Sequence, residues 1–128
     1  MRIAIAALAF AAGTAAAAPL ERYRWEARPI LVFAPSEDDP RLEAQLERFK
    51  SARAELEDRR NVVIVDTEPG SALRRRFEPE GFAVVLVGLD GGEKFRARDV
   101  VDPGTLNALI DRMPMRRREL ERRGERGG

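Results

Sequence analysis

The chain has 128 residues, of which 35% are charged and 44% are hydrophobic, with a formal net charge of +1. This composition excludes an integral membrane protein and a wholly disordered chain, and the length predicts a single folded domain. Because cysteine and histidine are both absent from the sequence, disulfides, thiol catalysis, zinc-finger sites and histidine-dependent acid–base chemistry are excluded as well.

The first 17 residues have the pattern of a secretory signal peptide. Arg2 supplies a positive end, residues 3–12 form an apolar run, and small residues follow it. The run is shorter than the roughly 20 residues that a membrane-spanning helix needs. We expect cleavage after Ala17 and a periplasmic or secreted mature protein that is not an integral membrane protein. An uncleaved membrane anchor is the alternative.

Four short segments have the composition of β-strands. Apolar runs at 30–34, 62–65 and 83–87 predict three strands that are buried on both faces of a sheet. An Asp-Gly-Gly turn at 90–92 predicts a hairpin, with a polar return strand at 93–97. Because charged residues alternate along this last strand, we expect it at the edge of the sheet.

Two Asp-Pro pairs mark the beginnings of the main helices. Asp39 and Asp102 are predicted N-caps, and each is followed by proline at the first helical position. The first helix carries apolar residues at helical spacing, interrupted by Arg53, and is predicted to end near residues 58–61. The second helix is predicted to break or kink at Pro114.

The order of these elements predicts an α/β, thioredoxin-like fold. A right-handed βαβ unit is followed by a ββα unit, and the connection between them has room for one or two helical turns at 72–77. The result is a four-stranded mixed sheet with helices on both faces. Numbered from the strand at 30–34, its order is 2-1-3-4. We expect this domain at 18–115 and an Arg/Glu-rich tail at 116–128.

The charges are distributed unevenly along the chain. Residues 36–58 contain eight acidic and four basic residues, whereas residues 112–128 contain seven arginines and three glutamates. The two segments can be solvated helix faces that attract each other. Alternatively, the basic segment is a tail that binds an anionic partner. We expect residues 115–126 to fray. The net charge gives no indication of specific nucleic-acid binding.

Several strings along the chain are characteristic. They are Tyr-Arg-Trp at 23–25 with Arg-Pro at 28–29, Arg-Asn-Val-Val at 60–63, Asp-Gly-Gly at 90–92, and Ile-Asp-Arg-Met-Pro-Met-Arg at 110–116 with Glu119. In these strings the chain resembles the bacterial domain-of-unknown-function family 4174. The resemblance implies an exported thioredoxin-like module, related to domains of animal secreted matrix proteins. It implies no activity.

The sequence argues against the disulfide chemistry of thioredoxins. An ungapped match places their Cys-Gly-Pro-Cys motif on Asp38-Asp39-Pro40-Arg41, which contains neither thiol. Carboxylates at 37–39 can occupy the positive end of the following helix, where a thioredoxin stabilises a thiolate. Gly81-Phe82 stand where a cis-proline is expected. Disulfide exchange and peroxide reduction at a cysteine are therefore excluded for this chain alone.

Two regions hold candidate binding residues, and no residue is a candidate for catalysis. The candidates are Asp111, Arg116, Arg117 and Arg118 in the C-terminal corner, and Ser36, Asp38 and Arg41 at the former active-site edge. Arginines in such a corner can bind a carboxylate or phosphate through two parallel hydrogen bonds. Alternatively, Asp111 orients Arg116 against the fold.

We expect no metal and no cofactor. Helix capping explains the acids at 37–39 better than a Ca²⁺ site, because the distal ligands of a calcium loop are missing. The thioethers of Met113 and Met115 suit Cu(I), but core packing and a helix end explain them as well. Trp25, with Tyr23, is expected to cover the sheet, and a ligand anchor is the alternative.

The sequence thus favours an exported, non-catalytic thioredoxin-like module that binds a protein or an anionic envelope component. One alternative is a thiol-independent enzyme or redox accessory that takes its cofactor from a partner. Another is an envelope-stress protein whose tail binds polyanions by charge alone. A deep pocket with convergent polar groups and shifted pKa values would favour the enzyme.

Overall fold

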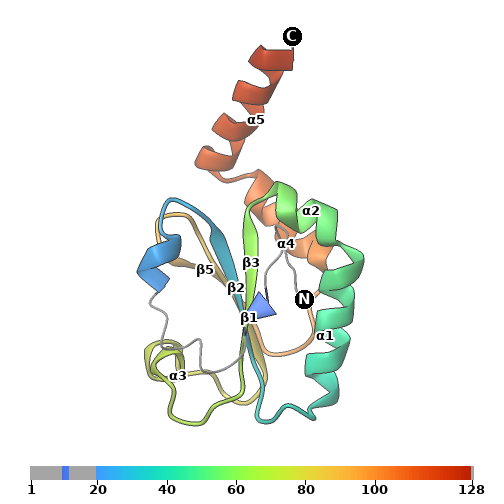
Figure 1. Ribbon diagram of the computed structural model, residues 1–128, viewed down its shortest axis with the longest axis vertical. Helices are drawn as coiled ribbons and strands as arrows, with labels where there is room; N and C mark the ends of the chain where they lie inside the picture. Colours follow the sequence, from blue (N-terminus) through green and yellow to red (C-terminus); the bar gives the residue numbers. More distant parts are fainter. Residues whose placement is uncertain (1–9, 12–19, 128) are drawn as a thin grey trace.

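The computed structural model describes residues 10–11 and 20–127, and Figure 1 shows a central sheet with helices on both of its faces. Its strands are β1 (Phe10–Ala11), β2 (Arg28–Phe33), β3 (Asn61–Asp66), β4 (Ala83–Val87) and β5 (Glu93–Ala97). The helices are α1 (Pro40–Ser51), α2 (Arg53–Asp58), α3 (Ala72–Phe77), α4 (Pro103–Asp111) and α5 (Pro114–Gly127), with a 3-10 turn η2 at Leu20–Tyr23.

The sheet has the order β1-β3-β2-β4-β5. Strands β2 and β3 are parallel, whereas β4 runs antiparallel to both β2 and β5. The predicted order of the four main strands is therefore confirmed. Strand β1 adds a short parallel pairing with β3. It falls within the predicted signal peptide, whose cleavage stays a prediction, and the other residues of that segment lie outside the described residues.

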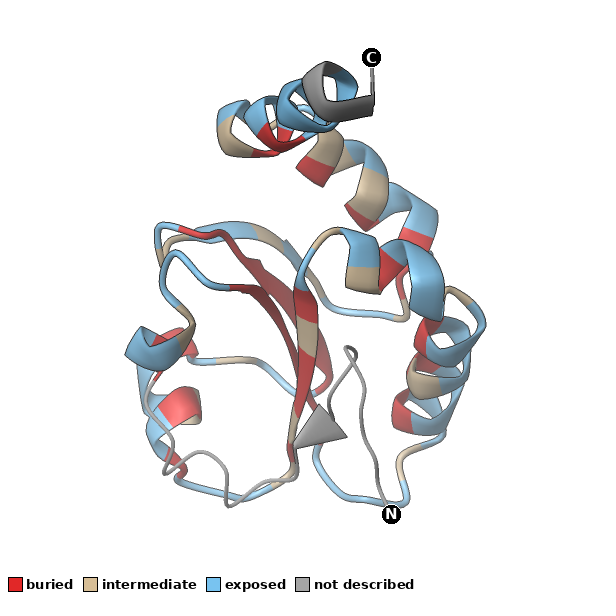
Figure 2. Ribbon diagram, turned by 45° about the horizontal axis from the view of Figure 1, so that its top comes forward, coloured by how far each residue is buried: buried red, intermediate tan, exposed pale blue. Residues whose placement is uncertain are grey.

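Alternate side chains of β2 face two different core clusters. Ile30 and Val32 pack with α1, α2 and α4 on one face of the sheet, whereas Leu31 and Phe33 pack with α3 and η2 on the other. Strands β2 and β4 are buried along their whole length and are coloured red in Figure 2. A strand that is covered on both faces needs the continuous apolar runs seen in the sequence.

The predicted N-caps are confirmed. The Asp39 side chain accepts a hydrogen bond from the backbone N–H of Arg41 at 2.8 Å, and Asp102 accepts one from Gly104 at 2.9 Å. The first predicted helix is divided at Ala52 into α1 and α2. This break leaves Arg53 exposed, which explains its place in an otherwise apolar stripe.

A buried glutamine joins α1 to the loop before α4. The amide of Gln45 is fully buried; it donates to the carbonyl oxygen of Val101 at 2.9 Å and accepts from the Val101 N–H at 2.7 Å. This pair satisfies both backbone groups of Val101 inside the core.

Residues 115–126 are helical in the structure, and their fraying stays a prediction. They form α5, which begins at Pro114, so the predicted boundary between residues 115 and 116 falls inside a helix. Proline is favoured in the first turn of a helix, where its missing N–H has no intrahelical partner. Pro114 therefore ends α4 and begins α5. Arg116 and Glu119 are buried against the fold, and most other side chains of α5 are exposed (Figure 2).

Candidate binding site at the C-terminal corner

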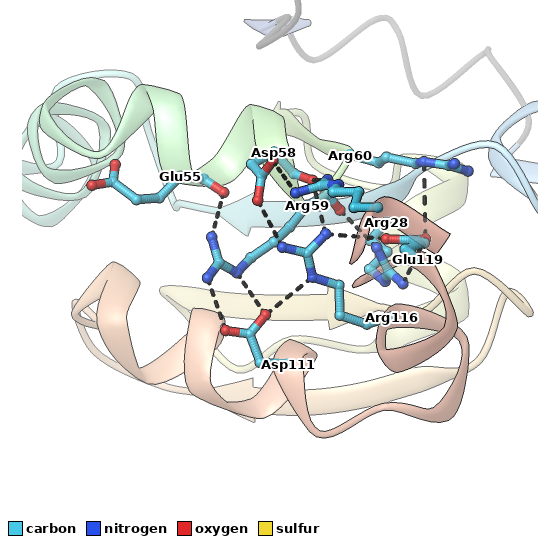
Figure 3. Close-up of polar contacts among 9 residues, drawn as sticks. Arg28, Glu55, Asp58, Arg59, Arg60, Asp111, Arg116 and Glu119 are labelled. Atoms are coloured by element: carbon cyan, nitrogen blue, oxygen red, sulfur yellow. Dashed lines mark hydrogen bonds and ion pairs between the residues drawn. The ribbon is translucent and has the colours of Figure 1, made fainter. Parts of the chain in front are cut away.

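Arg116 connects α5 to two other helices. Its side chain is 2% exposed and donates to Asp58 Oδ2 at 2.7 Å, to Asp111 Oδ1 at 3.1 Å and to Glu119 Oε1 at 3.2 Å (Figure 3). It also donates to the Asp58 carbonyl oxygen at 3.1 Å. A planar guanidinium with five N–H donors can hold several acceptors in fixed directions, which a lysine cannot do.

Arg28 brings the first residue of β2 into the same cluster. Its side chain is 1% exposed and donates to Glu119 Oε2 at 3.2 Å and to the Arg59 carbonyl oxygen at 2.8 Å. Arg59 in turn binds both oxygens of Asp111, at 3.1 and 2.8 Å. We call these residues the arginine–carboxylate network. Its members are Arg28, Asp58, Arg59, Asp111, Arg116 and Glu119, three cations and three anions.

The network shifts the pKa values of Asp58, Asp111 and Arg116 in the directions that keep them charged. Hydrogen bonds from Arg116 lower the pKa of Asp58, and hydrogen bonds from Arg59 and Arg116 lower the pKa of Asp111. Burial acts to lower the pKa of Arg116, but its hydrogen bonds to the carboxylates outweigh burial and raise it. Arg28 differs, because burial lowers its pKa.

A groove lies beside this network, between α5 and the loops that precede β2 and follow β4. It has two lobes that share Trp25, Leu89, Met115 and Arg118. We call the pair the corner groove. The apolar lobe has a volume of about 550 Å³, and the cationic lobe one of about 320 Å³. The apolar lobe also includes Arg28, Gly88, Asp90, Lys94, Met113 and Pro114, and the cationic lobe Arg60, Glu119 and Arg122.

Trp25 is held at the groove by its backbone. Its N–H donates to the Leu89 carbonyl oxygen at 2.7 Å, and its φ of 67° lies in the left-handed region that side-chain-bearing residues seldom adopt. The side chain is 56% exposed. The expected covering of the sheet by Trp25 is therefore wrong, whereas Tyr23 does pack against the core that contains Leu31.

The charged groups of the groove differ in how far they are paired. Lys94 forms an ion pair with Asp90 at 2.9 Å, and Arg60 approaches Glu119 only to 3.9 Å. Within the described part of the chain, Arg118 and Arg122 form no ion pair. The buried Nε–H of Arg28 likewise has no hydrogen-bond partner there. Arg118 and Arg122 therefore give the groove exposed donors that a ligand can use.

The structure separates the two predicted candidate regions. Asp111 and Arg116 belong to the network, so Asp111 orients Arg116 against the fold, while Arg117 and Arg118 are exposed on α5. The loop from Ser36 to Arg41 lies at the opposite end of the sheet from α5, as Figure 1 shows. Binding by any of these residues stays a prediction.

At that opposite end, the side chains of Ser36 and Arg41 form hydrogen bonds within their own loop and helix cap. Ser36 Oγ accepts a hydrogen bond from the Asp38 N–H at 3.3 Å. The Arg41 guanidinium donates to both oxygens of Asp39, at 3.2 and 3.0 Å, and lies over the Phe82 ring at 5.1 Å. Among the described residues, no group of three or more acidic side chains is arranged to hold a metal ion.

The sequence reasoning missed Arg28, Asp58 and Arg59 as members of the corner and did not place Glu119. A usable signal existed, because Arg28, Asp111, Arg116 and Glu119 all stand in the strings that carry the family resemblance. The structure brings these four separated residues into one contact network.

Comparison with known families and structures gives two findings. The model of the family Domain of unknown function (DUF4174) matches residues 19–119. Among solved structures, chloroplastic thioredoxin z is similar with a TM-score of 0.62 at 13% identity, over 84% of this chain and 95% of that one. A Thermus thermophilus thioredoxin gives a TM-score of 0.54 at 22% identity, over 81% and 85% of the two chains.

A Plasmodium vivax 2-Cys peroxiredoxin gives a TM-score of 0.58 at 10% identity, over 72% of this chain and 80% of that one. At these low identities, the structural similarity shows a thioredoxin-like fold and no activity. No curated protein matches the sequence. Within the described residues, none of the helices combines the length and the apolar character needed to cross a bilayer.

Proposed function

The chain belongs to the family Domain of unknown function (DUF4174), and we propose that within its thioredoxin-like fold it is a binding module and not an enzyme. The observation that carries this proposal is the corner groove, where the exposed Trp25 stands beside Arg118 and Arg122, which lack ion-pair partners among the described residues. Pockets that are mainly apolar with a few polar groups are typical of small-molecule sites.

The chemistry available at the corner supports binding over catalysis. A general acid or base works best with a pKa near the working pH. The pKa values of Asp58 and Asp111 are instead lowered by their arginine partners, so both stay ionised at neutral pH. With no cysteine or histidine in the sequence, the groove has no nucleophile–base pair of the usual kind.

We also propose that the protein is exported and that it meets its ligand in the cell envelope. The pattern of the first 17 residues supports this proposal. The amino-terminal residue of the protein recovered from the periplasm tests it, and Ala18 is the expected result. The same protein found intact in the cytoplasm would contradict it.

A fragment screen by NMR tests binding at the corner groove. Because Trp25 is the single tryptophan of the sequence, its indole N–H gives one assigned signal at the groove. We expect fragments that bind to shift this signal together with the amides of Leu89 and Met115. If fragments bind only around the Ser36–Arg41 loop, the corner groove is not the binding site, and if no fragment binds, the proposed function is wrong.

Two matched variants on α5 complete the test. Met115→Glu places a charged side chain in the wall shared by both lobes, and should abolish the shifts. Leu120→Glu makes the same change at an exposed apolar residue of α5 that lines neither lobe, and should preserve them. Equal effects of the two variants would contradict binding in the groove.

A further inference from the structure

The two lobes of the corner groove differ in chemical character. The apolar lobe is formed largely by Leu89, Met113, Pro114 and Met115, and its one lysine is already paired with Asp90. Methionine side chains are flexible and polarisable, so they adapt to apolar chains or rings of different shape. This lobe therefore suits the apolar part of a ligand.

The cationic lobe contains three arginines and one glutamate. Glu119 is bonded to Arg28 and Arg116 of the network, so its charge is already compensated from the inner side. Arg118 and Arg122 have no ion-pair partner among the described residues, and Arg60 lies 3.9 Å from Glu119. The lobe thus has positive charge that the described part of the fold does not neutralise.

Resting on the proposed function, we propose that the corner groove binds a small amphiphilic monocarboxylate. Its apolar chain lies in the apolar lobe, and its carboxylate lies in the cationic lobe beside Arg118, which belongs to both lobes. A guanidinium binds a carboxylate through two parallel N–H···O bonds. The 550 Å³ of the apolar lobe is within the range of small-molecule sites.

The cationic lobe contains one carboxylate, that of Glu119, which stands in its wall and is 7% exposed. Like charges at short distance repel each other strongly where solvent is partly excluded, and opposite charges attract each other as strongly. A dianionic phosphate monoester would meet twice the repulsion from Glu119 and twice the attraction to Arg118 and Arg122, so a decyl phosphate probe tests whether the ligand carries a single charge.

Fluorescence of Trp25 in the purified protein tests this assignment directly. The probes are decanoate, decanol, decyltrimethylammonium and decyl phosphate, each below its micelle concentration. We expect a saturable change in emission with decanoate and affinities at least tenfold weaker for the neutral and cationic analogues. A higher salt concentration should weaken the binding of decanoate, because part of the attraction is between exposed charges.

Two arginine variants distinguish a site from a general charge effect. Arg118→Gln should weaken decanoate binding about tenfold, the usual effect of losing one charge-assisted hydrogen bond. Arg117→Gln removes the same charge from an exposed neighbour that lines neither lobe, and should leave the affinity unchanged. Equal weakening in both variants would overturn the role of Arg118.

The remaining outcomes separate this assignment from the proposed function. If decanol or decyltrimethylammonium binds as tightly as decanoate, the ligand does not need a carboxylate, although the groove still binds a ligand. If decyl phosphate binds more tightly than decanoate, the assignment of a ligand with a single negative charge is wrong. If no decyl compound changes the emission, the assignment is wrong, and the fragment screen then decides separately whether the groove binds anything.

Discussion

Replacing Arg116 by methionine tests whether the arginine–carboxylate network holds α5 on the fold. The substitution keeps much of the side-chain volume and removes ion pairs to three carboxylates. The pair with Glu119 is buried at both ends, and a hydrogen bond to a charged group is worth about 1.5–3 kcal/mol. Asp58 and Asp111 are more than a third exposed, so their pairs add only about 0.2–1 kcal/mol each.

These contributions predict that Arg116→Met lowers the free energy of unfolding by about 3 kcal/mol, in line with other broken buried ion pairs. Urea unfolding followed by far-ultraviolet circular dichroism measures the loss. Arg117→Met is the matched control, because Arg117 is exposed and unpaired within the described residues, and should stay within about 0.5 kcal/mol. A loss below about 1 kcal/mol for Arg116→Met would refute the reasoning.

Two further predictions concern pH and the core. Since the pKa values of Asp58 and Asp111 are lower in the folded than in the unfolded chain, the stability they supply is present above about pH 4 and is lost as the pH falls through their folded values. Urea midpoints from pH 7 to 2 should show this loss, and a double Asp→Asn variant should flatten it. Gln45→Leu should lower the free energy of unfolding by about 3 kcal/mol in the same assay, because it leaves the N–H and the carbonyl oxygen of Val101 buried without partners. A loss below about 1 kcal/mol would mean that water replaces the amide of Gln45.

The sheet and the helix beginnings could be predicted because each depends on local chemistry. Continuous apolar runs are needed wherever helices cover both faces of a sheet, and β2 and β4 are such strands. The Asp-Pro pairs at 39–40 and 102–103 combine a capping carboxylate with a residue already suited to the first turn. Neither signal depends on distant contacts.

Helix α5 could not be predicted in this way, because its contact with the fold is ionic. A search for helices looks for apolar residues at helical spacing. Here the buried positions are Arg116 and Glu119, three residues apart, and both look like surface residues in the sequence. Arg28, which bonds to Glu119, stands 91 residues before it in the chain. Only the fold brings such pairs together.

The two ends of the sheet differ in how far their charged side chains are already paired. At the carboxyl end of β2, the Asp39 carboxylate caps α1, and Arg41 bonds back to the same carboxylate. Hydrogen bonds from Arg41 lower the pKa of Asp39, and the two side chains form an ion pair within this end of the sheet. At the end of the sheet near α5, Arg116 is paired within the arginine–carboxylate network. Arg118 forms no ion pair with the described residues and lies beside the apolar lobe of the corner groove. The corner groove, and not the Ser36–Arg41 loop, is therefore where we expect a ligand to bind.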